Sequence, residues 1–340
     1  MNLYIHFPFC RRKCSYCALH SRPGATEAER AEYVSRLAVQ LKERLSALDT
    51  QLATVYFGGG SPALCNLATL FDILSSHIAD TTEFTVELHP LDVTNDALLA
   101  LKSGGVNRIS MGIQSLDDAV LSAMGRGYTF AEAEMAFMLA REKFENAGID
   151  LIVGYPGETS ALTPRHARLA KWSLAHCSAY SLILEEKTAL AALLARGRVT
   201  MPDDDVVMDR IAILSRFLAD LGLKRYEISN YAIPGKECRH NLATWRGEDY
   251  IGLGEGAVGR IGLIRTKNGE ISETVTPDFD AKERTIFRLR TREGLDASRF
   301  PEWRDVLDAH VAHGLLTGKF PIYRLTERGM EVCDSILSDL

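Results

Sequence analysis

Short runs of apolar residues alternate along the chain with longer segments in which apolar residues recur every three or four positions. The short runs are typical of buried strands, and the longer spacing is typical of amphipathic helices. Six strands are predicted, at residues 2–7, 53–57, 83–88, 107–112, 149–153 and 179–184. Helices are predicted between them at about 26–48, 66–77, 95–103 and 163–175, with further helical segments before residue 146. This alternation predicts an α/β fold with a parallel sheet.

The pattern changes after residue 187. A helix with an acidic start is predicted at 202–221, followed by a strand at 225–231 and a glycine-rich stretch at 252–262. From about residue 280 the chain is predicted to be largely helical, and its end has winged-helix character. We therefore divide the chain into a first domain, residues 1–228, and a small C-terminal α+β domain, residues 229–340.

Composition narrows the classes of function. A formal net charge of −6 excludes a general nucleic-acid-binding surface. No run of about 18 apolar residues is present, so no membrane span is expected. The first residues lack the basic and apolar regions of a signal peptide, so we expect a cytoplasmic protein. In a reducing compartment the 7 cysteines are expected to be thiols or metal ligands rather than disulfides.

Three cysteines lie within eight residues, in the spacing C-x3-C-x2-C: Cys10, Cys14 and Cys17. Three thiolates from one loop suit a [4Fe–4S] cluster with one iron left open. A structural zinc site with His20 as the fourth ligand is the alternative. The basic residues within the loop, Arg11 to Lys13, are expected to lower the pKa values of the thiols. Cys65, Cys177 and Cys333 are expected to be buried as small apolar side chains.

This cysteine motif, with Tyr16 before its last cysteine, resembles that of radical S-adenosylmethionine (radical SAM) enzymes. The resemblance implies a partial (β/α)6 TIM-type barrel rather than a doubly wound sheet. It also implies a [4Fe–4S] cluster whose open iron binds the amino and carboxylate groups of SAM, and whose electron cleaves SAM to a 5′-deoxyadenosyl radical. In such barrels the chemistry gathers where strands end and loops begin.

Polar and glycine residues follow several predicted strands at that edge. By themselves, Gly58-Gly59-Gly60 could form a tight turn, and the polar residues could form ion pairs or helix caps. The resemblance instead implies that they bind SAM, because carboxylates and amides suit its ammonium and ribose and an arginine suits its carboxylate. The predicted SAM-binding residues are Gly58, Gly59, Gly60, Ser61, Glu87, Gln114, Arg126 and Asp150, with Tyr4 and Tyr16 as further contacts.

Longer strings resemble one branch of that family, the HemN/HemW group of anaerobic coproporphyrinogen oxidase-like proteins. These strings lie at 105–117, 124–126, 150–157 and 226–231, and the resemblance extends over almost the whole chain. Two classes of function compete within the branch. One is the radical decarboxylation of coproporphyrinogen III, or chemistry on another tetrapyrrole. The other is heme chaperoning, in which heme is bound and delivered to a recipient protein. An electron donor such as flavodoxin or ferredoxin is implied as well.

Three features favour the chaperone class. This sequence starts nine residues before Cys10, whereas the oxidases carry a longer N-terminal extension. Leu19 stands where the oxidases have another cysteine. Residues 239–245 resemble the chaperones' HNxxYW heme-binding motif, although Thr244 replaces its tyrosine and Val258 replaces a histidine farther along. His240 and Cys238 are the candidate heme ligands, while His240 could also be a structural residue and Trp245 is expected to be core packing.

Overall fold

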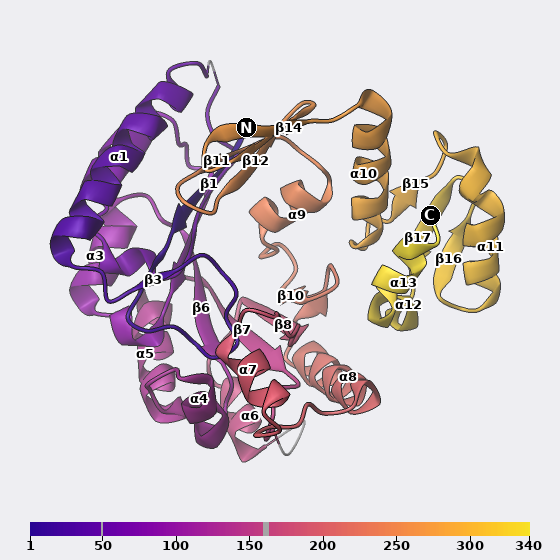
Figure 1. Cartoon of the computed structure of the whole chain (residues 1–340), viewed down its shortest axis with the longest axis horizontal. Coiled ribbons are helices and arrows are strands. Elements are labelled where there is room, and N and C mark those ends of the chain that lie inside the picture. The colour runs from indigo at the N-terminus through magenta and orange to yellow at the C-terminus, as the bar shows by residue number, and fades with distance from the viewer. Residues whose placement is uncertain (49, 159–162) are drawn as a thin grey trace.

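The structure is a computed structural model that describes residues 1–48, 50–158 and 163–340. A curved sheet dominates it, with strand order β14-β13-β12-β11-β1-β4-β5-β6-β7-β8-β10-β9 (Figure 1). Its middle is formed by six neighbouring parallel strands: β1 (Asn2–Phe7), β4 (Thr54–Gly59), β5 (Glu83–Leu88), β6 (Arg108–Gln114), β7 (Asn146–Val153) and β8 (His176–Ser181). The predicted partial (β/α)6 barrel is confirmed.

Helices that connect these strands cover the outer side of the sheet (Figure 1). They are α1 (Glu27–Leu45), α2 (Ala68–Leu74), α3 (Asn95–Ser103), α4 (Asp118–Met124), α5 (Phe130–Lys143) and α6 (Pro164–Leu169). The capping box of Thr26 and Glu29 is present at the start of α1. Leu37 and Leu41 of α1 are buried against the sheet, and each fully buried leucine contributes about 1.5–3 kcal/mol. In the described ranges, no helix has the length and apolarity needed to cross a membrane.

The far part of the chain extends this sheet at both edges. Beyond α7 (Ala189–Ala195) and α8 (Asp204–Asp220), β9 (Lys224–Arg225) and β10 (Asn230–Ala232) add an antiparallel hairpin to β8. After α9 (Arg239–Trp245), β11 (Tyr250–Leu253) pairs in parallel with β1, at the opposite edge of the six strands. The antiparallel strands β12 (Val258–Ile261), β13 (Ile264–Lys267) and β14 (Glu270–Thr274) follow it.

The last part of the chain has a hydrophobic core of its own, which contains Leu289, Leu307, Tyr323 and Ile336. It comprises α10 (Pro277–Leu289), β15 (Leu295–Asp296), α11 (Arg304–Ala312), β16 (Leu316–Lys319), β17 (Ile322–Leu325), α12 (Glu327–Glu331) and α13 (Cys333–Ser338). Its three strands form a separate sheet in the order β15-β17-β16. The domain boundary after residue 228 stays a prediction, and beyond it β10–β14 still belong to the large sheet.

Three strand predictions were wrong in detail. The strand predicted at 149–153 begins three residues earlier, at Asn146. The strand predicted at 179–184 lies three residues earlier, because the polar residues His176 and Ser178 also pair with β7. The strand predicted at 225–231 is interrupted by a turn. In this turn the buried carboxylate of Glu227 accepts a hydrogen bond from the N–H of Ser229 (2.9 Å), so the segment forms the β9–β10 hairpin.

Candidate functional site

The loop that carries the three cysteines begins at β2 (Phe9–Cys10) and returns at β3 (Arg22–Pro23), which pairs with β2. Cys10, Cys14 and Cys17 are free and partly exposed. The loop after β4 lies directly against β2, where the Ser61 N–H donates to the Phe9 carbonyl (2.7 Å). A Cβ atom on Gly60 would lie 2.2 Å from the Phe9 oxygen and 2.8 Å from the Cys10 Sγ, so this approach requires glycine.

A cavity of about 210 Å³, hereafter the cluster cavity, lies at the carboxyl ends of the parallel strands. Most of the predicted site residues converge on it: Cys10, Cys14, Tyr16, Cys17, Gly59, Gly60, Ser61, Glu87, Gln114, Arg126 and Asp150. Gly58 and Tyr4 are not in its lining. Gly58 lies beneath it, where a Cβ would be 3.1 Å from the Glu87 carboxyl carbon, and Tyr4 lines a second cavity.

Both acidic and basic side chains line the cluster cavity. Glu87 accepts hydrogen bonds from the Tyr56 hydroxyl (2.8 Å) and the Gly59 N–H (2.9 Å). Burial, together with the nearby Asp150, raises the pKa of Glu87 to about 7. The Arg126 guanidinium is also buried, and it donates to the Gly112 carbonyl (2.7 Å) and to the Cys14 Sγ (3.3 Å). The cavity therefore offers carboxylates to an ammonium group and a guanidinium to a carboxylate.

The expectation that the basic loop residues lower the thiol pKa values was wrong for two of the cysteines. Burial raises the pKa of Cys10 to about 11 and also raises that of Cys17, and it outweighs the opposing charges of Lys13 and Arg126. Arg11 is engaged elsewhere, in an ion pair with Asp92.

The three thiols suit a cluster better than a single ion. Within the described ranges, no three His, Cys, Asp or Glu side chains meet closely enough to hold one metal ion. His20 pairs instead with Glu255 (3.2 Å), so the alternative of a zinc site with His20 is not supported. In a cubane each cysteine binds a different iron, so three thiols spread around a cavity fit a [4Fe–4S] cluster with one open iron.

Sequence reasoning missed several residues of the cluster cavity. Asp92, in the short 3-10 helix η2 (Pro90–Asp92) after β5, accepts hydrogen bonds from Ser61 (2.5 Å) and Arg11, and so joins two of the loops. His89 also lines the cavity, and burial beside three arginines lowers its pKa to about 3. The Tyr180 hydroxyl, at 3.5 Å, donates to Gln114. Only His89 carried a signal in the sequence, because it directly follows a predicted strand, whereas Asp92 comes four residues after that strand and Tyr180 falls near the start of the one predicted at 179–184.

A second cavity, of about 410 Å³, adjoins the first and is hereafter the tyrosine cavity. Its lining includes Tyr4, Tyr56, Tyr180, Tyr250, Asn230, His240, Asn241, Thr244 and Val258. Glu87, Asp150 and Tyr180 line both cavities and thus form the wall between them. Among the described residues that line the tyrosine cavity, none is a lysine or an arginine. The two positions that depart from the family motif, Thr244 and Val258, therefore lie at the same cavity as His240.

His240 is buried, and its ring lies beside that of Tyr56 (5.1 Å between centroids). Its Nδ1 is hydrogen-bonded to the Thr54 hydroxyl (2.7 Å). Burial and the charge of Arg108 lower its pKa to about 4, so the imidazole is neutral at pH 7.

Cys238 and Trp245, on either side of these residues, are not in the lining of this cavity. Cys238 is fully buried, and its thiol donates to Glu83 (3.6 Å). Trp245 is half-buried, and it packs against Phe287 and beneath the Arg290 guanidinium. The structure therefore brings His240, but not Cys238, to the tyrosine cavity.

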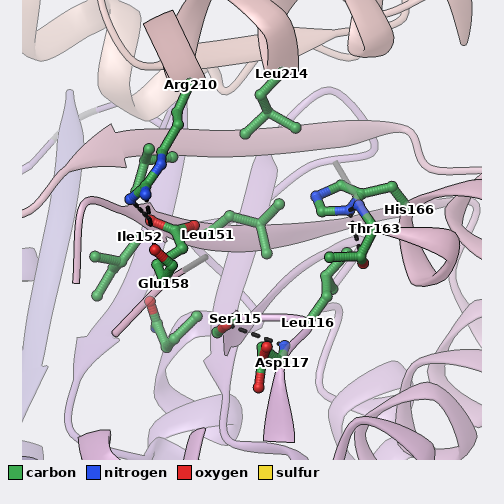
Figure 2. A pocket seen from close by; sticks show the side chains of 12 residues that line it. Ser115, Leu116, Asp117, Leu151, Ile152, Glu158, Thr163, His166, Arg210 and Leu214 are labelled. Carbon is green, nitrogen blue, oxygen red and sulfur yellow. Dashed lines mark hydrogen bonds and ion pairs between the residues drawn. The ribbon is translucent and has the colours of Figure 1, made fainter. Parts of the chain in front are cut away.

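Figure 2 shows a smaller cavity, of about 40 Å³, between β7 and helices α6 and α8. Its charged groups already bind one another, since Arg210 donates to the Glu158 carboxylate (3.1 Å) and to its carbonyl (2.7 Å). The cluster cavity and the tyrosine cavity therefore remain the candidate site.

Comparisons with known proteins agree with this geometry. Residues 4–170 match the Radical SAM superfamily. The chain is 33% identical to the heme chaperone HemW of Mycobacterium tuberculosis, with 100% of this chain and 94% of the relative covered. It is 32% identical to that of Bacillus subtilis, with 88% and 86% covered. Coproporphyrinogen III oxidase (HemN) from Escherichia coli, a radical SAM enzyme, shares the fold, with a TM-score of 0.81, 21% identity and coverage of 99% and 89%.

Proposed function

Because the chain belongs to the HemW family of radical SAM proteins, we propose that it is a heme chaperone that binds heme in the tyrosine cavity. The proposal includes a recipient protein for the heme and an external electron donor, such as a flavodoxin or ferredoxin, for the cluster. Membership in the superfamily implies a [4Fe–4S] cluster and SAM. We assign Cys10, Cys14 and Cys17 as the cluster ligands and the cluster cavity as the SAM site.

The observation that carries the proposal is a neutral imidazole at a cavity with aromatic walls. His240 lines the tyrosine cavity, and a neutral imidazole nitrogen is a good ligand for heme iron. Tyr4, Tyr56 and Tyr250 provide aromatic surface on which a porphyrin can pack. Cys238 is not proposed as a ligand, because its buried thiol is not in the lining.

SAM, when bound to the cluster, supplies a 5′-deoxyadenosyl radical by reductive cleavage. The residues of this chain bind and orient it. Glu87 and Asp150 suit its ammonium and ribose hydroxyls, and the Arg126 guanidinium suits its carboxylate. Tyr56 and the Gly59 N–H hold the Glu87 carboxylate in place.

Oxidation of coproporphyrinogen III is a second candidate function. It is favoured by the common wall of Glu87, Asp150 and Tyr180, because a tetrapyrrole in the tyrosine cavity would lie next to the SAM site. Charge argues against it. Coproporphyrinogen carries four propionates, whereas heme carries two on one edge, and the described lining offers two carboxylates and no basic side chain. Heme can leave both propionates in solvent.

A heme titration tests the proposal. Reconstituted protein is titrated with hemin under anaerobic conditions, and the Soret band is followed. We expect saturable binding that His240→Ala abolishes and that a matched control, His313→Ala in the C-terminal region, retains. In parallel, the protein is incubated with SAM, reductant and coproporphyrinogen III. Absence of hemin binding by the wild-type protein, or formation of protoporphyrinogen, would overturn the chaperone assignment.

A further inference from the structure

His240 is connected through hydrogen bonds to two residues that lie outside the tyrosine cavity. Asn2 of β1 and Thr54 of β4 are direct partners in the register of the parallel sheet. Both side chains are buried, and the Thr54 hydroxyl lies 2.9 Å from the Asn2 Oδ1 and 2.7 Å from the His240 Nδ1. A chain of polar groups therefore runs from the first strand to the imidazole.

The hydrogen bonds of Asn2, at the end of this series farthest from His240, determine which group donates in each hydrogen bond of the series. The Asn2 Nδ2 lies near two groups that can only accept, the Asp249 carbonyl (3.1 Å) and the Glu248 carboxylate (3.4 Å). The amide oxygen of Asn2 consequently faces Thr54 and takes the single hydroxyl proton. The Thr54 oxygen is left with lone pairs only, so the His240 Nδ1 must carry a proton and donate it.

This arrangement leaves the other ring nitrogen free. With the proton on Nδ1, the Nε2 atom of His240 has a lone pair, and it makes no hydrogen bond to any residue in the described part of the chain. Histidines that bind metals generally donate their second N–H to a neighbouring acceptor, which fixes the tautomer and makes the ligand nitrogen more basic.

The helix that carries His240 is also held from the sheet. Cys238, the residue that precedes this helix, forms no hydrogen bond from its side chain to the N–H groups at the start of the helix. Glu83 of β5 replaces that cap, because its two carboxylate oxygens accept the N–H groups of Arg239 (2.9 Å) and His240 (3.0 Å). The position of the imidazole and its tautomer are thus set by three residues from three neighbouring strands.

We propose that Asn2 and Thr54 are positioning residues that hold His240 in the Nδ1–H tautomer, with Glu83 anchoring its helix, so that Nε2 is presented to the iron of a ligand in the tyrosine cavity. The proposal deepens the assigned heme site and rests on it for the identity of the ligand. The tautomer itself does not depend on any ligand, and it can be measured alone.

The first test is nitrogen NMR of reconstituted protein labelled with 15N-histidine, at pH 7 and without heme. His240→Gln identifies the signal of His240 among the 9 histidines. We expect the wild-type protein to show a protonated Nδ1 and an unprotonated Nε2. Thr54→Val removes the acceptor and should shift the population toward Nε2–H, whereas Thr54→Ser should retain the wild-type tautomer. A wild-type Nε2–H tautomer, or no change in Thr54→Val, overturns the proposal.

The second test measures hemin binding in the same variants. Loss of such a partner typically weakens metal affinity about 10–100-fold, so we expect Thr54→Val to bind hemin that much more weakly and with an altered Soret band. Thr54→Ser should retain the hemin affinity and the Soret band of the wild-type protein. Asn2→Leu provides a second variant, because it frees the threonine hydroxyl to donate and should mix the two tautomers.

Different experimental results would overturn this proposal and the heme assignment. If the wild-type protein binds no hemin, the heme assignment fails, while the NMR result still decides the tautomer. If His240→Ala abolishes binding but Thr54→Val binds hemin with wild-type affinity and spectrum, the heme assignment stands and the positioning role is overturned.

Discussion

At the scale of single residues, burial alone does not distinguish the histidine proposed as the heme ligand. His6, His176 and His240 are all buried, and burial lowers the pKa of each. His6 uses both ring nitrogens, with the Tyr4 hydroxyl (3.0 Å) and the His20 carbonyl (3.1 Å) as partners. His176 is hydrogen-bonded to Tyr226 (2.8 Å) and lines none of the cavities described above. His240 differs because its second nitrogen is left for the tyrosine cavity.

The raised pKa of Glu87 leads to a prediction about how the stability of the protein depends on pH. Its pKa is raised from 4.5 to about 7 in the folded protein, so between these values the folded state binds more protons than the unfolded state. Stability must therefore fall as pH rises through this range. Glu87→Gln cannot titrate, so its stability relative to the wild type should improve by about 2–3 kcal/mol between pH 5 and pH 8. Urea unfolding of cluster-free protein at several pH values measures this.

Glu29 provides the control for that experiment. Its pKa is lowered by hydrogen bonds from Thr26, so it is ionised in both the folded and the unfolded state above pH 5. Glu29→Gln should lose the capping box, with a change in stability that is the same at pH 5 and pH 8. A Glu87→Gln effect that is equally flat would contradict the raised pKa.

At the scale of elements, the sequence correctly predicted those helices and strands whose formation depends on residues close to one another along the chain. The strands at 2–7 and 83–88 appear as predicted, and the helix predicted from residue 26 begins there, because the apolar pattern of the strands and the Thr26–Glu29 capping box act within a few residues. The pairing of β11 with β1 was not predicted, because it joins residues about 250 positions apart and its glycine-rich sequence carries no strand signal.

The candidate site was predictable for a related reason. Most residues of the cluster cavity lie on a parallel strand or in the segment that follows one, and the parallel fold brings all strand ends to one edge. The tyrosine cavity was not predictable as a whole, because Tyr56, Asn230 and His240 meet only when α9 lies across the strands. Asp92 escaped notice for a similar reason, since its partners Arg11 and Ser61 come from other loops.

The contact between the loop after β4 and the cysteine loop predicts the effect of Gly60→Ala. The added Cβ would lie 2.2 Å from the Phe9 carbonyl oxygen, so one of the loops must move and Cys10 with it. We expect iron content to fall well below the roughly four irons per chain of the reconstituted wild type, toward the level of Cys14→Ala. Gly262→Ala is the control: it strains the left-handed backbone at Gly262 (φ 55°), but no atom lies within 4 Å of its Cβ position and no cysteine of the cluster loop has to move. Full iron loading of Gly60→Ala would contradict the close approach.

At the scale of the whole molecule, the large sheet reaches across the predicted domain boundary. β11 pairs with β1 from Asn2 to Ile5, and His240 reaches Thr54 from the helix that precedes β11. The tyrosine cavity consequently has walls from both sides of residue 228, with Tyr4 and Tyr56 on one and His240 and Tyr250 on the other. The separate hydrophobic core begins farther on, at α10.

Hydrogen exchange decides which division holds in solution. Regions that unfold together exchange together, and the smaller core should open at lower denaturant concentration than the large one. In intact protein with added guanidinium chloride, we expect β16 and β17 to exchange first, and β11 to exchange later, together with β1 and β4. Exchange of β11 together with β16 and β17 would instead place the boundary at residue 228. Late exchange of β11 would mean that the wall carrying His240 opens only when the barrel itself unfolds, so that heme would have to enter and leave through the mouth of the tyrosine cavity.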